Sequence, residues 1–161
     1  MELEQAKQEL IQAVERLQEK KDLAGKVEPD YYEPGQMEDL EQYLGEYRAE
    51  TGEIRIRTES RGLRYEERTP RLNALSVGDP VRLEREPENP FNGNNIMILT
   101  PEGASLGNLP AELCNAIAPL WDSGCLRVLD SRVSYVKRIA ERSRYARQGI
   151  LFVEIRLGLS I

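Results

Sequence analysis

The stretch from Gly78 to Leu109 constrains the fold most, because it holds three short apolar segments separated by strong turn signals. The segments read 80-PVRLERE-86, 96-IMIL-99 and 104-ASLGNL-109. Between the first two lies 89-NPFNGNN-95, whose asparagines and glycine favour positive φ and local backbone hydrogen bonds, and so reverse the chain. Three short strands in about thirty residues predict a small barrel or a curled sheet.

The elements on either side of this stretch are predicted from periodicity. Residues 53–60 alternate isoleucine with arginine, which is typical of a strand with one wet, basic face. Residues 110–124 begin with proline, end with glycine and place their apolar side chains on one helical face. Residues 126–160 indicate a long β-hairpin whose tip, residues 137–147, is basic. We therefore expect an α+β fold with one internal helix and a terminal hairpin.

The N-terminus predicts an amphipathic helix. Residues 2–24 contain neither glycine nor proline and space their apolar residues by three or four. Leu3, Leu10 and Leu17 repeat at seven residues, which allows a short coiled coil as well as packing on the same domain. Three heptads are few for a coiled coil that stands alone, so we favour packing within the chain.

Charge divides the chain near residue 50. Residues 1–50 hold 14 acidic and 6 basic residues, a net −8, whereas residues 51–161 hold 14 acidic and 16 basic residues, a net +2. Residues 37–47 have helical apolar spacing and predict a second helix. We therefore expect an acidic segment of two helices over residues 1–50 and a mildly basic domain over residues 51–161.

Composition removes many classes of enzyme. The chain has no histidine, which excludes Ser-His-Asp and Cys-His catalysis and every histidine-containing zinc site. Its two cysteines, Cys114 and Cys125, cannot form a four-cysteine site, and we expect them to be reduced and packed as small apolar residues. Nucleotide-binding glycine motifs are missing. We expect no cofactor, no metal and no catalysis; a nuclease using aspartate and glutamate stays open, although no spacing favours it.

The chain also lacks the signals of membrane insertion and export. No apolar run approaches the ~18–20 residues of a membrane helix, and the start, 1-MELEQAKQEL-10, has neither part of a signal peptide. We therefore expect an intracellular, cytoplasmic protein without a membrane partner.

Residues 78–113 resemble the HIRAN domain. They read GDPVRLEREPENPFNGNNIMILTPEGASLGNLPAEL, and the family signature is G-D-x-V-x-L-x-R-E-P-x-N-P-[YF]-D-x-N-A-I-x-V, then G-x-x-[LV]-G-[HY]-[LI]-P and a helix. With its flanking strands the resemblance covers residues 51–161. It implies a small β-barrel related to OB and SH3-like barrels, found alone or at the N-terminus of DNA-remodelling translocases. Characterised members capture single-stranded DNA at its 3′-hydroxyl end.

The resemblance also implies a set of binding residues. Phe91 occupies the aromatic position of the motif, Asn92 that of the usual aspartate, and Asn108 that of the usual histidine or tyrosine. Arg64 and Tyr65 resemble the basic and aromatic pair of the first strand. Stacking on such rings contributes ~1–3 kcal/mol per base. Phe91 and Tyr65 are thus expected to stack, Arg64 to contact phosphates, and the two asparagines to hold the terminal nucleotide.

Some positions depart from the family pattern or allow two interpretations. Asn92 has no charge with which to exclude a terminal phosphate, and Phe91 can either plug the core or form an exposed platform. Outside the motif, the hairpin tip offers Arg138, Arg142 and Arg144 as phosphate contacts, although a charged tip is also typical of a solvated turn.

The resemblance over residues 78–113 implies a non-enzymatic module that captures single-stranded DNA, and we expect capture at a 3′ end. The alternative is a protein-interaction or oligomerisation adaptor that uses the helices in residues 1–47. The net −8 of the first fifty residues favours that alternative, because it repels DNA unless the helices are held away from the site.

Overall fold

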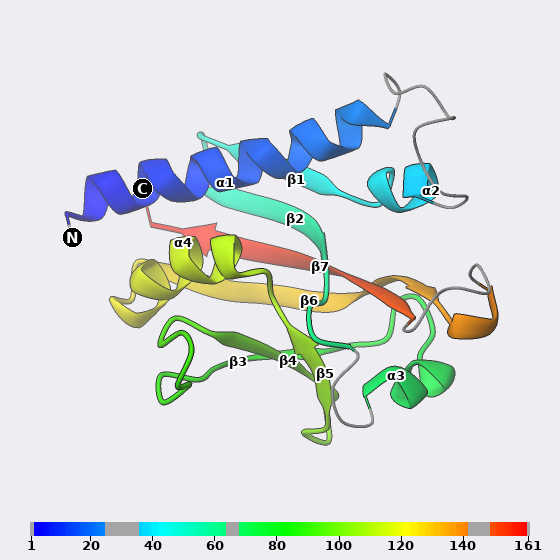
Figure 1. Cartoon of the computed structure of the whole chain (residues 1–161). Coiled ribbons are helices and arrows are strands. Elements are labelled where there is room, and N and C mark those ends of the chain that lie inside the picture. The colour runs from blue at the N-terminus through cyan, green and yellow to red at the C-terminus, as the bar shows by residue number, and fades with distance from the viewer. Residues whose placement is uncertain (1, 25–35, 64–67, 142–148, 161) are drawn as a thin grey trace.

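The computed structural model describes residues 2–24, 36–63, 68–141 and 149–160 (Figure 1). The helices are α1 (Leu3–Leu23), α2 (Gln36–Leu40), α3 (Arg68–Arg71) and α4 (Ala111–Asp122), with 3₁₀ turns at Leu72–Ala74 and Ile139–Glu141. The strands are β1 (Leu44–Arg48), β2 (Glu53–Glu59), β3 (Arg82–Arg85), β4 (Ile96–Leu99), β5 (Ser105–Asn108), β6 (Leu126–Lys137) and β7 (Ile150–Leu159). The α+β class, the internal helix α4 and the terminal hairpin β6–β7 are confirmed. Within the described part, no helix is long and apolar enough to span a membrane.

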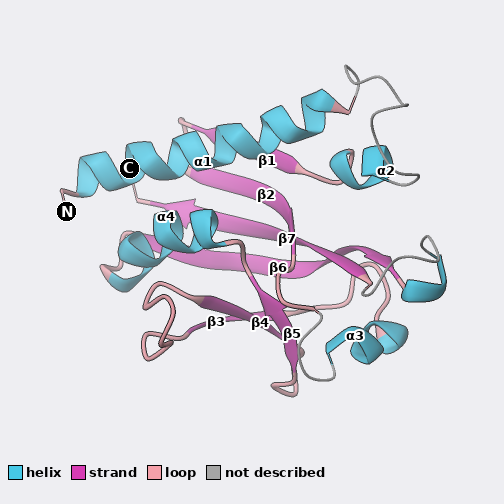
Figure 2. Ribbon diagram, viewed as in Figure 1, coloured by secondary structure: helices cyan, strands magenta, loops and turns pink. Residues whose placement is uncertain are grey.

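The strands form two antiparallel sheets, ordered β1-β2-β7-β6 and β3-β4-β5 (Figure 2). β4 is central in the smaller sheet, as its uniformly apolar sequence predicts. Isolated bridges join the sheets at two corners, Arg61 with Asn108 and Pro80 with Arg132. The predicted small OB-like barrel is confirmed as an OB-like fold, but the barrel is not closed: the described strands of the two sheets pair only locally at these corners.

One apolar core lies between the two sheets and the helices. β2 buries Ile54, Ile56 and Thr58 on one face, which confirms the alternation expected from its sequence. At the other end of the core, the ring of Phe152 meets that of Tyr43 edge to face, with 4.9 Å between centroids. Because the first strand pair and the terminal hairpin contribute to one cluster, the core continues from β1 to β7.

Helix α1 is docked along the larger sheet by its apolar face. Leu10 and Leu17 are 0% and 4% exposed, so packing within the chain is confirmed as the use of this face. Gly45 permits the contact, because a Cβ there would lie 1.8 Å from the carbonyl oxygen of Val14. The amide of Gly45 also donates to Oε1 of Gln18 at 3.2 Å. In this arrangement the heptad leucines Leu10 and Leu17 are not available to a partner.

The prediction of a second helix over residues 37–47 was wrong beyond Leu40. Residues 44–48 form β1, paired with β2 from Leu44 opposite Arg57 to Arg48 opposite Glu53. Gly45 would cost a helix interior ~1 kcal/mol, whereas an extended strand pairs its backbone with β2 and admits α1. The hairpin closes where the amide of Gly52 donates to the carbonyl of Arg48 at 2.8 Å. The predicted boundary at residue 50 between an acidic segment and a basic domain stays a prediction. The strand pair β1–β2 has one strand on each side of that boundary.

Candidate functional site

A groove of about 550 Å³ opens beside the 89–95 turn, where α1, β5 and the first turn of α4 meet. Leu109, Pro110 and Ala111 form part of its wall, and the ring of Phe91 lies at its side. The hydrogen-bonding and charged side chains that line it are those of Lys20, Arg61, Asn89, Asn92, Asn95, Asn108 and Glu112. The structure therefore brings three of the sequence-predicted residues, Phe91, Asn92 and Asn108, into one groove.

The turn is held by its own asparagines. Oδ1 of Asn89 accepts from the amides of Phe91 and Asn92, both at 2.9 Å. Oδ1 of Asn92 accepts in turn from the amide of Asn94 at 3.0 Å. These contacts confirm that the asparagines shape the backbone, and they leave the ring of Phe91 96% exposed. Of the two interpretations of Phe91, the structure selects the exposed platform.

Arg85 of β3 fastens this turn to α4. Its guanidinium donates to the carbonyls of Asn95 at 2.7 Å and Gly93 at 3.0 Å. The same group forms a fork on the Asp122 carboxylate, with both distances 2.9 Å. These hydrogen bonds hold the pKa of Asp122 below its usual value. Arg85 therefore sets the position of the turn that carries Phe91, without lining the groove itself.

A chain of amides runs from the turn to β5. Nδ2 of Asn95 donates to Oδ1 of Asn108 and to Oε1 of Glu86, both at 3.0 Å. Nδ2 of Asn92 donates to Oδ1 of Asn115 on α4 at 3.1 Å. Asn108 thus presents its oxygen to Asn95, and no described group accepts from its Nδ2. The amide network orients both sequence-predicted asparagines before any ligand arrives.

Gly107 explains why Asn108 lies beside Arg61. Its φ is +110°, and a Cβ there would meet Oγ of Ser60 at 2.1 Å and the carbonyl oxygen of Arg61 at 2.4 Å. β5 can therefore press against the chain leaving β2, where the amide of Arg61 donates to the carbonyl of Asn108 at 2.8 Å. Arg61 also pairs with Glu59 at 2.7 Å, and its side chain is 60% exposed.

Helix α1 supplies the remaining charged groups. Lys20 lines the groove, and its Nζ lies 4.8 Å from the centroid of the Tyr43 ring. Arg16, one turn earlier, forms an ion pair with Glu112 in the first turn of α4. The single carboxylate among the lining residues is thus paired with a cation from the N-terminal helix.

The other predicted binding residues are not brought to this groove. Nη2 of Arg138 donates to the carbonyl of Leu75 at 3.2 Å, and its Nη1 lies 3.8 Å from the Glu141 carboxylate. Arg138 is therefore engaged near the 3₁₀ turn that precedes β3 and does not line the groove. Four predicted residues lie outside the described residues: Arg64, Tyr65, Arg142 and Arg144.

Sequence reasoning missed Lys20, Arg61 and Asn95 as lining residues of the groove, and Asn115 as the partner of Asn92. The sequence contains a weak indication that Arg61 is exposed at a turn, because it follows a predicted strand and precedes a glycine. It contains no indication that Lys20 lines the groove, since the position of Lys20 depends on how α1 packs on the rest of the domain. Within the described residues, no three carboxylates or cysteines lie close enough to hold a metal ion, so the acid cluster that a metal-dependent nuclease needs is not found there.

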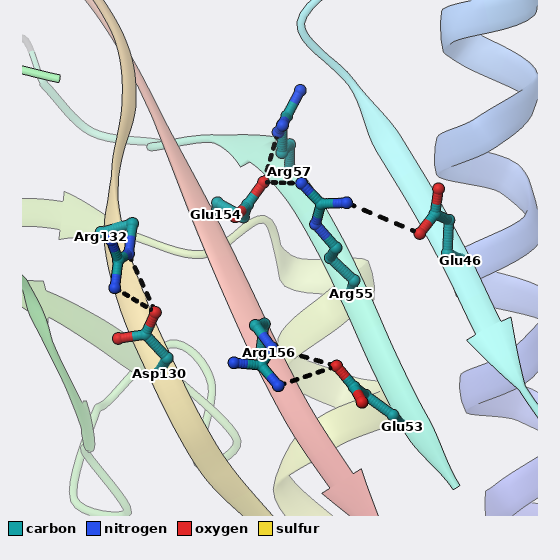
Figure 3. A network of polar contacts seen from close by, with 8 residues as sticks. All are labelled: Glu46, Glu53, Arg55, Arg57, Asp130, Arg132, Glu154 and Arg156. Atoms are coloured by element: carbon teal, nitrogen blue, oxygen red, sulfur yellow. Dashed lines mark hydrogen bonds and ion pairs between the residues drawn. The ribbon is translucent and has the colours of Figure 1, made fainter. Parts of the chain in front are cut away.

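The arginines of β2 lie on the face of the larger sheet opposite to its buried isoleucines. On that face the arginines form ion pairs with carboxylates (Figure 3). We call this set the arginine ladder: Glu46, Glu53, Arg55, Arg57, Asp130, Arg132, Glu154 and Arg156. Glu154 accepts from Arg57 at 2.6 Å and from Arg55 at 3.0 Å. Burial acts to raise the pKa of Glu154, but these hydrogen bonds outweigh it and hold the pKa below its usual value. The predicted basic face is therefore neutralised.

Solved structures, HIRAN domains among them, have partial similarity to this chain. Its fold is similar to the crystal structure of the HIRAN domain of human HLTF, with 22% identity, coverage of 67% of this chain and 81% of that one, and a TM-score of 0.49. The crystal structure of a protein from Lactobacillus plantarum is 24% identical, with coverage of 65% of this chain and 98% of that one, and a TM-score of 0.49. The NMR structure of the HLTF HIRAN domain in its DNA-bound conformation is 22% identical, with coverage of 65% of this chain and 75% of that one, and a TM-score of 0.42. No curated protein sequence matches the chain.

The family comparison is decisive. The model of the HIRAN domain matches residues 54–149, more than half of the 161-residue chain. That span includes the 89–95 turn, β5 and α4, which form most of the groove. The resemblance found in residues 78–113 is thereby confirmed, and the chain belongs to the HIRAN domain family.

Proposed function

We propose that this HIRAN domain binds single-stranded DNA in the groove, captures it at a 3′ end and catalyses no reaction. The observation that carries the proposal is the ring of Phe91, 96% exposed on a turn that Asn89 and Arg85 hold by hydrogen bonds. Membership of the HIRAN family supports it as well, since the HIRAN domain of HLTF has a DNA-bound conformation.

The exposed ring favours stacking of a base. A large apolar side chain in water is costly to leave uncovered, and its position costs little further ordering because Asn89 and Arg85 already hold the turn. One stacked base contributes ~1–3 kcal/mol and places few demands on sequence. Double-stranded DNA keeps its bases stacked on each other, so the same ring favours an unpaired strand.

The amides beside the ring favour a terminal nucleotide. Nδ2 of Asn108 is directed to no described acceptor, and it can donate to a hydroxyl or phosphate oxygen. Asn92 stands where the family has an aspartate, and a neutral amide does not repel a 3′-phosphate. We therefore propose 3′-end capture with weak discrimination between a hydroxyl and a phosphate end.

Cations at the groove and beyond it complete the proposal. Arg61 is exposed at the edge of the groove and can reach a phosphate. Contacts by Arg64, Tyr65, Arg138, Arg142 and Arg144 remain part of the proposal on the strength of the sequence alone.

Fluorescence anisotropy with oligonucleotides labelled at an internal base tests these points. We expect the wild-type chain to bind a single strand at low salt, and to bind a strand with a free 3′ end more tightly than a circular one. Asn92→Asp should increase the preference for a 3′-hydroxyl over a 3′-phosphate, because it adds a charge that repels the phosphate. No binding up to ~100 μM at low salt, where electrostatic attraction is strongest, contradicts the function. Equal affinities for circular and linear strands contradict 3′-end capture but leave single-strand binding standing.

A further inference from the structure

One lining residue of the groove, Lys20, comes from outside the HIRAN match. The family model covers residues 54–149, whereas Arg16 and Lys20 belong to α1 and Tyr43 lies just before β1. Lys20 lines the groove together with Phe91, Asn92 and Asn108. An acidic segment that charge alone would separate from a DNA site is therefore built into its edge.

The charge pattern of α1 fits this placement. Arg16 and Lys20 are four residues apart, so they share one face of the helix. The described acids of α1 do not line the groove, and the acid nearest to Lys20 in the sequence, Glu19, is exposed. Lys20 thus lines the groove and Arg16 pairs with the lining residue Glu112, whereas the described acids of α1 are not lining residues, although the first fifty residues are strongly acidic.

Lys20 is held where a phosphate can be reached. Its side chain is half-buried, with Nζ 4.8 Å from the Tyr43 ring centroid, and that ring packs edge to face on Phe152 in the core. Within the described residues Lys20 has no carboxylate partner. Its charge is therefore placed by packing and stays available, unlike the arginines of the ladder.

Arg16 removes an obstacle to the same ligand. Glu112 lines the groove in the first turn of α4 and would repel a phosphate if it were unpaired. The ion pair with Arg16 offsets that charge and ties α1 to α4. Because Gly45 lets the helix lie directly on β1, the position of both cations is set by close packing of backbone on backbone.

We propose that α1 is a wall of the nucleic-acid groove, in which Lys20 contacts a phosphate of the bound single strand while Arg16 neutralises Glu112. The inference rests on the proposed single-strand function and extends it to a helix that the family match leaves out. The ligand group is a phosphodiester of an unpaired strand.

The full-length chain carries the test, with anisotropy of one 5′-labelled single strand at several salt concentrations. Lys20→Gln should weaken binding about threefold to tenfold at low salt, and should reduce the slope of log affinity against log salt by about 0.7. Lys20→Arg should keep most of the affinity. The matched control is Lys21→Gln, which removes the same charge from the next position, outside the groove lining. Equal effects of Lys20→Gln and Lys21→Gln overturn the proposed contact.

The ion pair has its own test. Arg16→Gln should weaken binding about twofold to fivefold, because it exposes the charge of Glu112. The double variant Arg16→Gln with Glu112→Gln should recover wild-type affinity, since it removes both charges together. An Arg16→Gln variant that is folded by circular dichroism and binds as tightly as wild type overturns the neutralising role.

The two levels of the proposal fail in different ways. If wild type binds, Phe91→Ala loses affinity and Lys20→Gln does not, the wall inference is overturned while the proposed function stands. If the wild-type chain binds no single strand, the function is overturned and the inference falls with it.

Discussion

The groove and the arginine ladder show that the number of cations on a surface does not make it a nucleic-acid site. The ladder holds four arginines, and each has a carboxylate within 3.0 Å. The groove is lined by only two cations, Lys20 and Arg61, but it adds an exposed ring and oriented amides. Every arginine of the ladder has a carboxylate partner inside the chain, whereas Lys20 has none among the described residues. Arg61 pairs with Glu59, but its side chain is 60% exposed beside the ring and the amides.

The ladder follows from strand register. β2 and β7 place Arg57 opposite Glu154 and Arg55 opposite Arg156, so arginines meet acids directly or diagonally across the strands. A phosphate that bound there would first have to separate these pairs. In the groove it would meet Lys20, which has no acidic partner among the described residues, and the unused donor of Asn108.

The largest expected effect is the loss of the platform. Phe91→Ala should weaken single-strand binding about tenfold to a hundredfold, because the ring supplies the stacking surface. Its melting temperature should stay at the wild-type value, since the ring is 96% exposed. Val77→Ala is the matched control, because it trims an exposed apolar side chain away from the groove. Similar affinities for wild type and Phe91→Ala by anisotropy would mean that the strand binds elsewhere.

A ladder substitution should affect stability and leave binding intact. Glu154→Gln should lower the free energy of unfolding by about 1–3 kcal/mol at pH 7, because Arg55 and Arg57 lose a charged acceptor. The folded-state pKa of Glu154 lies below the unfolded value, so this contribution is present above about pH 4.5 and disappears as the pH falls through the folded pKa. Urea unfolding of the variant and of wild type measures the loss at pH 7 and its disappearance below pH 4.

The control for the ladder is Glu102→Gln, which makes the same change at an exposed turn position. It should unfold like wild type at both pH values. If Glu154→Gln is as stable as Glu102→Gln at pH 7, or weakens single-strand binding markedly, then the contrast between the two regions is wrong.

Unpairing the ladder should create weak binding. In the Phe91→Ala background, Glu53→Gln frees the charge of Arg156, and Glu46→Gln removes the more distant of the two carboxylate partners of Arg55, which still pairs with Glu154. We expect affinity for a single strand to rise about twofold to fivefold at low salt and the gain to vanish at high salt, as for non-specific contacts. Anisotropy at two salt concentrations measures it, and an unchanged affinity would show that pairing is not what silences this face.

The smallest expected effect is that of removing a ladder arginine. Arg57→Gln should change single-strand affinity by less than about twofold, because its guanidinium is already used by Glu154. Arg61→Gln makes the same change at the groove edge and should weaken binding more, because Arg61, although paired with Glu59, lines the groove and is 60% exposed. Reversal of that order in parallel anisotropy titrations would place the phosphates on the sheet.

Local chemistry made the 89–95 turn and β4 predictable. Asparagine, glycine and proline restrict the backbone by themselves, and a uniformly apolar tetrapeptide indicates a central strand. The exposure of Phe91 was not predictable, because an aromatic residue in a turn fits both alternatives. It depends on Arg85, which fastens the turn to Asp122 of α4 and leaves the ring outside.

The errors concern contacts between distant segments. Residues 43–47 satisfy helical spacing and can equally serve a strand, and pairing with β2 decided between them. Gly45 was the available warning, since glycine is a poor helix residue and here allows α1 to reach the sheet. Lys20 entered the groove through that docking, which no local pattern encodes.

The most direct test of the central claim is an NMR titration of the ¹⁵N-labelled full-length chain with a short single-stranded oligonucleotide. Binding in the groove predicts that amide shifts change at residues 89–95, 108–112 and around Lys20, and that the ladder strands at residues 53–57 and 154–156 stay unmoved. Shift changes concentrated on the ladder strands, or none at saturating oligonucleotide, would contradict the account.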